Sequence, residues 1–294
     1  MANLKEIRNR IASVSSTQQI TSAMKMVSAA KLRRAQEAIL QMRPYADQLR
    51  VILSYLSEAI RDEEDDPFGV EREIQRVLIV VITSNRGLCG SFNSTVVKHS
   101  VQIAHEQYGS LMRQGNVDFF AIGKRGADYL RKNDYHLTGN KSGLFDDLNF
   151  ENAMPVAEAI MSDYIYKKYD RILLVYNQFK NAAVQILTIE QFLPVVHPEQ
   201  TEDTTYATDY IFEPSKEYIL KELIPRSLKI QFYKALLDSH AAEHGARMTA
   251  MHKATDNATE MIRDLRLTYN KARQASITKE ILEIVSGAEA LQKG

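Results

Sequence analysis

The side chain best suited to covalent chemistry is the single cysteine, Cys89, in the segment SNRGLCGSFN at residues 84–93. A thiol beside an arginine can ionise at a lowered pKa and act as a nucleophile, with a histidine as its base. His99 and His105 are the candidates for that base, but no sequence feature places either beside Cys89. A lone cysteine is more often a small buried hydrophobe, so we expect no catalytic thiol. One cysteine also excludes an internal disulfide and fits a reducing compartment.

The same segment is the candidate nucleotide-binding loop, because it follows a β-branched run at residues 76–83. A dinucleotide-binding loop would read GxGxxG, and a mononucleotide loop GxxxxGK[ST]. The chain has only Gly87 and Gly90 at this place, and the IGKRG run at residues 122–126 lacks the following Ser or Thr. We therefore expect these glycines to serve a tight turn and predict no nucleotide site.

Metal and acid–base chemistry have equally little support. The seven histidines are scattered, without HxxH or HExxH spacing. This pattern predicts no metal site. The carboxylates of residues 62–66 lie in a loop without apolar surroundings that could raise their pKa, which is typical of a solvated linker. We expect no catalytic residue, no cofactor and no metal.

The middle of the chain alternates strand and helix patterns, which predicts a small doubly wound α/β domain at residues 75–195. The expected strands are residues 76–83, 117–123, 171–179 and 183–192, the last two forming a hairpin. The expected helices are residues 94–113, 124–132 and 155–168, and the expected loops are residues 61–69, 137–152 and 198–214, the last with a short edge strand at 210–213. The loop at 61–69 marks the first domain boundary.

The C-terminal segment, residues 215–294, has a helical period. Ser215 caps a short helix to Leu223, and Pro225 bends the chain before the long helix. Apolar or small residues then recur at steps of four and three: Leu237, Ala241, His244, Met248, Met251, Thr255, Ala258, Ile262, Leu265, Tyr269 and Ala272. This heptad seam predicts one helix of roughly 90–100 Å, which is too long for the core of a compact fold. His244 is most simply a polar residue that sets the register of a coiled coil.

The N-terminal segment, residues 1–60, supplies a partner helix that begins near Leu4 and contains Pro44. It has the same rhythm at Leu4, Ile7, Ile11, Val14, Leu32, Ala35, Ile39, Met42, Ala46, Leu49, Leu53, Leu56 and Ile60. Between the two runs the seam turns polar, at Gln18, Thr21, Lys25 and Ser28, while an apolar collar spreads around the helix at Ile20, Ala23, Met24, Met26, Val27, Ala29 and Ala30. Either other helices or partners pack against the collar from more than one side, or the buried face shifts gradually around the helix axis there. The two terminal helices are expected to pack as an antiparallel coiled coil.

The composition limits the function classes. The chain has 294 residues with 37 basic and 37 acidic side chains, so no global preference for nucleic acid or membrane surfaces is indicated. Residues 1–50 carry nine Lys or Arg against three Asp or Glu, which suits acidic partner loops. With no run of eighteen apolar residues and an amphipathic helix at the start, we expect no membrane span, secretory signal or transit peptide. Two alternatives remain: an α/β hydrolase or dehydrogenase, disfavoured by the missing glycine pattern, and a coiled-coil adaptor for nucleic acid, disfavoured by sparse aromatic residues in the basic stretches.

Three stretches resemble the γ subunit of F-type ATP synthases: IRNRIASVSSTQQITSAMKMVSAAKLRRAQ, SNRGLCGSFN and RMTAMHKATDNATEMIRDLRLTYNKARQASITKEILEIVSGAEAL. The resemblance covers the whole chain in the same order. It implies a non-catalytic rotor shaft, an antiparallel coiled coil inside a ring of three α and three β subunits, with an α/β domain that touches the ε subunit and the membrane c-ring. Rotation driven by a proton or sodium gradient would then drive ATP synthesis at the β subunits.

The resemblance also assigns roles to single residues. Met24 matches a shaft methionine that faces acidic loops of β, and the family's polar contact and coupling positions match Arg247, Arg273, Gln274, Thr278 and Glu280. The chain lacks the inserted cysteine pair of chloroplast members, so no thiol switch is implied. The implied location is the cytoplasmic side of a bacterial cell membrane, as a peripheral protein that reaches the membrane only through other subunits and binds no nucleic acid.

Overall fold

The computed structural model describes residues 4–57, 67–69, 72–195 and 216–292. The chain divides into two compact units: unit 1, residues 1–28 and 248–294, and unit 2, residues 29–247. Two long helices, α1 (Leu4–Ser57) and α6 (Lys216–Gln292), belong to both units. Several predictions concern residues or side chains outside those described: the loop at 198–214, the cap at Ser215, most of the acidic loop at 61–69, and the seam positions Leu53, Leu56 and Ile60.

Unit 2 contains a five-stranded sheet in the order β3-β2-β1-β4-β5. The strands are β1 (Val77–Ile82), β2 (Val117–Ile122), β3 (Leu137–Asn140), β4 (Arg171–Phe179) and β5 (Gln185–Leu193). The first four are parallel, and β5 pairs antiparallel with β4, which confirms the predicted hairpin. A parallel sheet must be covered on both faces, and all six residues of β1 are buried.

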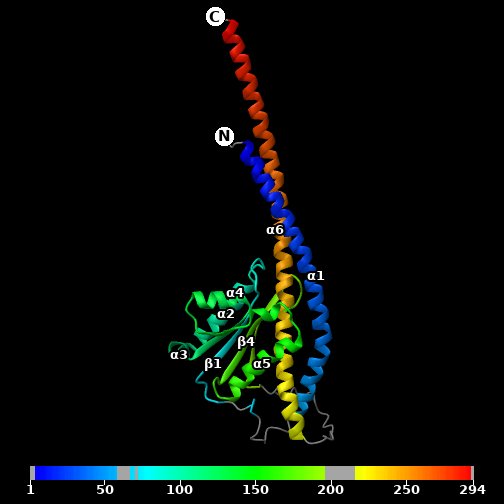
Figure 1. The fold of residues 1–294 in the computed structure, drawn as a ribbon, viewed down its shortest axis with the longest axis vertical. Coiled ribbons are helices and arrows are strands. Elements are labelled where there is room, and N and C mark those ends of the chain that lie inside the picture. The colour runs from blue at the N-terminus through cyan, green and yellow to red at the C-terminus, as the bar shows by residue number, and fades with distance from the viewer. Residues whose placement is uncertain (1–3, 58–66, 70–71, 196–215, 293–294) are drawn as a thin grey trace. The chain divides into compact units, whose positions relative to one another are not determined.

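The helices of unit 2 cover the two faces of this sheet (Figure 1). They are α2 (Phe92–Glu106), α3 (Gly109–Arg113), α4 (Lys124–Lys132) and α5 (Phe150–Ile165), with a 3₁₀ turn, η1 (Ser142–Phe145). Val77, Ile79 and Val81 of β1 pack in one apolar cluster with α2 and Leu130 of α4. Leu78, Val80 and Ile82 pack in the other with α5 and the part of α6 around Phe232. The fold is therefore an α/β sheet domain flanked by the long terminal helices, as the sequence predicts.

Four predictions of elements in unit 2 are wrong, and two of them concern residues 137–155. Residues 137–152 are not a loop: they contain β3, η1 and the start of α5, and β3 escapes notice because it is a short edge strand with half-exposed side chains. Helix α5 begins at Phe150 rather than Pro155, because the side chain of Asn149 caps it by accepting a bond from the amide of Asn152 (2.7 Å).

The single helix expected at residues 94–113 is two helices, α2 and α3. Tyr108, between them, has non-helical backbone angles, and its side chain is 5% exposed in an apolar cluster. At the other end of the unit, the separate short helix expected to end at Leu223 is instead the first part of α6, which contains Pro225. The lost backbone bond at this proline is offset by burial of Ile224, Leu228 and Phe232 against the sheet.

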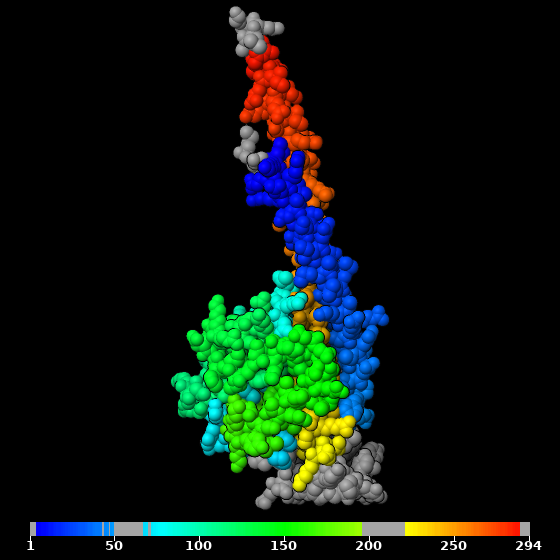
Figure 2. All heavy atoms as spheres, viewed as in Figure 1, coloured from blue at the N-terminus to red at the C-terminus, as the bar shows by residue number. Residues whose placement is uncertain are grey.

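Unit 1 is an antiparallel helix pair. Arg8 of α1 donates to the hydroxyl of Tyr269 in α6 (2.8 Å), and Gln18 donates to Thr259 (2.6 Å). From the first contact to the second, the residue number rises by ten in α1 and falls by ten in α6, as an antiparallel register requires. The space-filling view shows these parts of α1 (blue) and α6 (orange) in contact, whereas the last turns of α6 (red) have no partner helix (Figure 2). None of the described helices is apolar over a long enough stretch to cross a membrane.

Candidate functional site

The seam predicted in unit 1 is the line along which α1 and α6 touch. Ile7 and Thr21 of α1 and Met251, Ala258 and Ile262 of α6 are buried, each less than 9% exposed. The polar seam positions stay in phase with the apolar ones, because Thr21 and Thr255 share a hydrogen bond between their hydroxyl oxygens (2.8 Å). A drift of the packing phase is therefore wrong as an explanation of the collar.

The apolar collar lies outside this seam, and the described part of the chain leaves most of it uncovered. Ile20 is 59% exposed, Met26 66% and Val27 57%, while Met24 is half-buried at the edge of the seam. Apolar side chains of this size, close together on one helix, form the kind of surface that protein partners cover. The collar is thus a candidate contact surface.

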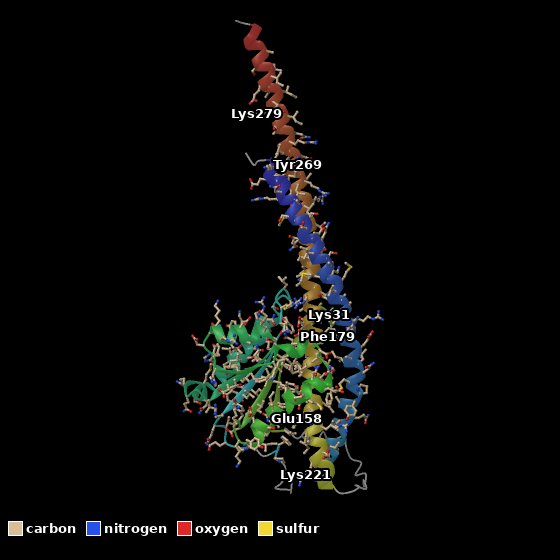
Figure 3. All side chains as sticks on the ribbon, viewed as in Figure 1. Lys31, Glu158, Phe179, Lys221, Tyr269 and Lys279 are labelled. Atoms are coloured by element: carbon tan, nitrogen blue, oxygen red, sulfur yellow. The ribbon has the colours of Figure 1, made fainter. Side chains whose placement is uncertain are left out.

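The second exposed surface of unit 1 is the end of α6. All residues from 277 to 288 are exposed, including Ile277, Ile281 and Ile284. Arg273, Gln274, Thr278 and Glu280 are exposed on the same stretch. Within the described chain, their one side-chain hydrogen bond runs from the Thr278 hydroxyl to the carbonyl of Gln274 (2.9 Å). Helical spacing puts Arg273 and Glu280 on one face and Gln274 and Thr278 on another. Lys279, labelled in Figure 3, pairs with Glu283 on the same helix (3.5 Å).

In unit 2 the place to look for a bound ligand is the loop after β1. The strand order reverses between β1 and β4, and doubly wound sheets bind ligands outside the carboxyl ends of the strands at such a point. Ser84 and Asn93 tie the loop together through a bond from the Ser84 amide to the Asn93 side-chain oxygen (2.9 Å). Gly90 has a φ of +62°, so the tight turn predicted for this glycine is confirmed.

Side chains of α6 occupy this point. The guanidinium of Arg247 donates to the carbonyl oxygens of Gly87 and Arg86, the latter at 3.2 Å, and pairs with Glu243 (2.5 Å). Burial raises the pKa of the Glu243 carboxyl, which the arginine opposes. Helix α6 passes close to the turn of the β4–β5 hairpin at Gly245. If this residue had a Cβ atom, it would lie 3.2 Å from the backbone of Ala182. Phe179, at the end of β4, is labelled in Figure 3. The crevice that holds a nucleotide in related folds is thus filled by a helix.

Cys89 does not have the surroundings of a nucleophile. It is 1% exposed, and its sulfur accepts a bond from the Asn93 side-chain amide (3.2 Å). Burial raises the pKa of the thiol, although a nucleophile needs it lowered. His99 and His105 are exposed, and the ring of His99 contacts the carbonyl of Thr95 (2.9 Å). The interpretation of Cys89 as a small buried hydrophobe is the one its environment supports.

Two buried polar clusters in unit 2 were not predicted from the sequence, although His244 of the second was noted there as a polar seam residue. The carboxylate of Asp118, 1% exposed in β2, accepts bonds from Arg76 (3.0 Å), Tyr169 (2.8 Å) and the ring of His136 (2.5 Å). An aspartate inside the apolar run VDFFAI was the available signal. The cluster lies at the start of β2, far along the strands from the loop after β1.

The second cluster is a histidine pair on α6. The Nε2 atoms of His240 and His244 are 3.1 Å apart, and the ring of Phe145 stacks on His240. Burial, with the nearby cation Lys31, lowers the pKa of His240 to about 4 and that of His244 to about 3. Within the described ranges, no group of three or more His, Cys, Asp or Glu side chains is arranged to hold a metal ion.

Comparison with known proteins identifies the family. A family model described as ATP synthase matches residues 3–291. The ATP synthase gamma chain of Cytophaga hutchinsonii is 55% identical over 293 residues, covering 99% of this chain and 99% of that one, and the gamma chain of Flavobacterium johnsoniae is 58% identical over 291 residues with the same coverage. The chain belongs to the ATP synthase gamma-chain family. Gamma chains are non-catalytic, so this protein is a non-catalytic subunit of the F-type ATP synthase, in its central stalk, and a peripheral subunit of a membrane complex.

Chains in solved structures of ATP synthases have a similar fold. A chain from a structure of the central stalk and c-ring of the Tetrahymena thermophila mitochondrial ATP synthase is 25% identical with a TM-score of 0.57, covering 80% of this chain and 99% of that one. A chain of the Euglena gracilis enzyme, from a structure of its F1 and c-ring in rotational state 3, is 23% identical with a TM-score of 0.73, covering 99% of this chain and 95% of that one. The family model and the gamma-chain relatives confirm the sequence resemblance to the γ subunit.

Proposed function

We propose that this chain is the shaft that turns inside a ring of three α and three β subunits and couples ion-driven rotation to ATP synthesis at the β subunits. Its central α/β domain, residues 75–195, contacts the ε subunit and the membrane c-ring, while the helices of residues 1–60 and 215–294 form the shaft. The complex lies on the cytoplasmic side of a bacterial membrane, in keeping with the bacterial origin of the gamma chains it resembles. The driving ion is a proton or sodium.

The observation that carries this proposal is the unpartnered surface of the helix pair. The pair buries only one seam, and it leaves the collar and residues 277–288 of α6 exposed. A free monomer gains nothing from apolar side chains such as Ile20, Val27 and Ile284 in water. A ring of subunits around the helix pair would cover these side chains. This role requires no catalytic group on the shaft itself.

The surface of the helix pair also differs between its α1 side and its α6 side, and rotary coupling needs such an asymmetric shaft. The collar lies on α1, where residues 7–36 contain no Asp or Glu, whereas α6 carries Asp256, Glu260 and Asp264 on exposed positions. Three identical β subunits around such a pair each face a different pattern of charge and apolar surface. Rotation of the shaft by part of a turn therefore changes which β subunit faces which pattern.

Within this shaft, Met24 meets acidic loops of β at the edge of the collar. Arg273, Gln274, Thr278 and Glu280 contact the ring from the exposed part of α6, where they are free to bond outside the chain. Arg247 acts differently, because its guanidinium is already bound to the loop after β1. It couples by holding Arg86 and Gly87 against α6, as a positioning residue.

Purification on a gentle density gradient tests the role as a whole. We expect the chain in single copy in a large ATPase complex with α, β and ε subunits. A stable monomer that binds nucleotide or turns over a substrate would reject the proposal, and so would salt-sensitive binding of the free chain to DNA.

A single substitution tests the role of Met24. Met24→Lys adds a cation beside acidic β loops, so it should leave assembly largely intact and lower the ATP yield per transported ion. The matched control is Met261→Lys, which adds the same cation at a 53% exposed position on α6. The measurement is ATP synthesis against ion flux in membrane vesicles. An unchanged yield in Met24→Lys, or an equal loss in Met261→Lys, removes Met24 from the coupling residues.

A further inference from the structure

A groove runs between α1 and α6 in unit 1, and no function described above uses it. Its polar lining consists of Ser15 and Gln18 of α1 and of Arg263, Arg266 and Asn270 of α6. Tyr269, labelled in Figure 3, immediately precedes Asn270 and marks this turn of α6. The groove has a volume of about 380 Å³, and sites for small molecules have volumes of about 300–1,000 Å³. Its size therefore suits a small molecule.

The charge of the groove is one-sided. Arg263 and Arg266 are three residues apart on α6, so their side chains lie on neighbouring parts of one helix face. Across the described ranges, neither guanidinium is within ion-pair distance of a carboxylate. Glu260 and Asp264 of the same helix do not line the groove, and residues 7–36 of α1 contain no Asp or Glu. Two cations therefore face a groove whose walls offer no counter-charge.

Neutral donors lie beside the two cations. The Gln18 amide nitrogen donates to Thr259 (2.6 Å), which ties α1 to α6 at the groove. Within the described residues, the Ser15 hydroxyl and the side-chain amide of Asn270 have no hydrogen-bond partner. Both can donate to an oxygen of a bound anion. Guanidinium groups bind phosphate oxygens through two parallel N–H bonds, which are stronger than bonds from neutral donors.

The number of charges and the apolar lining narrow the class of ligand. A phosphate monoester carries a charge of about −1.5 to −2 at pH 7 and three acceptor oxygens, so it balances two arginines, whereas a carboxylate carries a single charge. Ile262, 7% exposed, and Leu267, 54% exposed, also line the groove and can pack on an apolar group of the ligand. We infer that this groove binds a small organic phosphate, with its phosphate on Arg263 and Arg266 and its apolar group on Ile262 and Leu267.

A ligand of this kind links the two helices, because Ser15 belongs to α1 and both arginines belong to α6. Isothermal titration calorimetry of the full chain at low salt tests the binding, with phenyl phosphate, inorganic phosphate and benzenesulfonate as probes. We expect phenyl phosphate to bind about fivefold more tightly than inorganic phosphate, because inorganic phosphate lacks the apolar group. It should also bind about fivefold more tightly than benzenesulfonate, which has the same ring and a smaller charge.

Substitutions locate the site. Arg263→Gln with Arg266→Gln should weaken the binding of phenyl phosphate and of inorganic phosphate at least about tenfold. Leu267→Ala should remove the advantage of phenyl phosphate and leave the affinity for inorganic phosphate within about twofold. The matched control, Lys253→Gln with Lys271→Gln, removes two exposed charges of α6 that do not line the groove, and it should change neither affinity by more than about twofold.

Three results would overturn the inference. If phenyl phosphate does not bind in the millimolar range, the groove is not a site for organic phosphates. If phenyl phosphate and inorganic phosphate bind equally, the apolar lining contributes nothing. If the two double variants weaken binding to the same extent, the net charge of α6 explains it. Circular dichroism checks that each variant keeps its helix content, and a negative result on the free chain leaves the shaft role untouched.

Discussion

The sheet of unit 2 and the helix pair of unit 1 bury their side chains very differently. In the sheet every residue of β1 is buried, and apolar clusters cover both of its faces. In the helix pair one narrow seam is buried, and all residues from 277 to 288 are exposed. The sheet therefore has its complete core within one chain, whereas the helix pair has a stabilising contact on one side and a free surface on the others.

This difference in burial indicates that unit 2 is stabilised by its own core, whereas unit 1 depends more on contacts with partners. A doubly wound sheet loses much of its free energy of folding if one buried side chain is cut back, because its interior is close-packed. A two-helix seam has few such positions, and its exposed surface becomes apolar contact area when partners bind. The comparison predicts that substitutions in unit 2 change folding, while those on the surface of unit 1 change assembly and coupling.

The largest expected effect is in the core of unit 2. Phe232→Ala removes a fully buried ring from the contact between α6 and the sheet, and it should lower the free energy of unfolding by about 3–5 kcal/mol. The matched substitution in unit 1, Leu267→Ala, trims a 54% exposed side chain and should cost less than about 0.5 kcal/mol. Urea titration monitored by circular dichroism measures both. Equal losses would break the comparison between the two units.

A pH-dependent effect on stability comes from the histidine pair. Free histidine has a pKa of about 6.5, whereas His240 and His244 have folded values of about 4 and about 3. Between pH 6.5 and 4 the unfolded chain therefore binds protons that the folded chain does not, so stability falls as the pH falls through this window. The loss of stability levels off below about pH 3, where both histidines bind a proton in the folded chain as well.

Substitution of one histidine of the pair isolates its contribution to the pH dependence of stability, measured as the slope of stability against pH. His244→Gln should reduce the loss of stability between pH 6.5 and 4 by about half, because one titrating group remains. His105→Gln, at an exposed position of α2, should leave the slope unchanged. The measurement is the urea midpoint as a function of pH. A slope that is the same in His244→Gln as in the original chain would show that another group causes it.

The smallest expected effect is in the seam of unit 1. The hydroxyl oxygens of Thr21 and Thr255 are 2.8 Å apart, and each also lies within hydrogen-bond distance of a carbonyl of its own helix. Each hydroxyl has one hydrogen, so one of them donates to the other and the second donates to its own helix carbonyl. Thr21→Val with Thr255→Val replaces the layer with apolar groups of similar shape, so the net change should stay within about 1 kcal/mol. A double-mutant cycle of melting temperatures separates the coupling of the pair from the single effects. A coupling above about 2 kcal/mol would mean that the polar layer is a main source of stability in the seam.

Periodicity in the sequence was enough for most of the fold. The strands of the α/β domain and the seam between the two terminal helices follow from local spacing. The spacing of apolar residues, either β-branched runs or heptad repeats, tells which side chains share a face. Boundaries set by single side chains were harder: the Asn149 cap and the non-helical Tyr108 each moved the end of a helix. The exposure of the collar also needed the structure, since its pattern alone allowed two explanations.

The sequence by itself determined that the two ends of the chain form paired helices, that the middle forms an α/β sheet, and that the chain resembles the gamma-chain family. Only the tertiary structure decided that Arg247 bonds to the loop after β1, that Asp118 collects Arg76, His136 and Tyr169, and that two arginines share a groove without a counter-charge. The physical reason is separation along the chain. Arg247 and Gly87 are 160 residues apart, and no local pattern specifies a contact that depends on how whole elements pack.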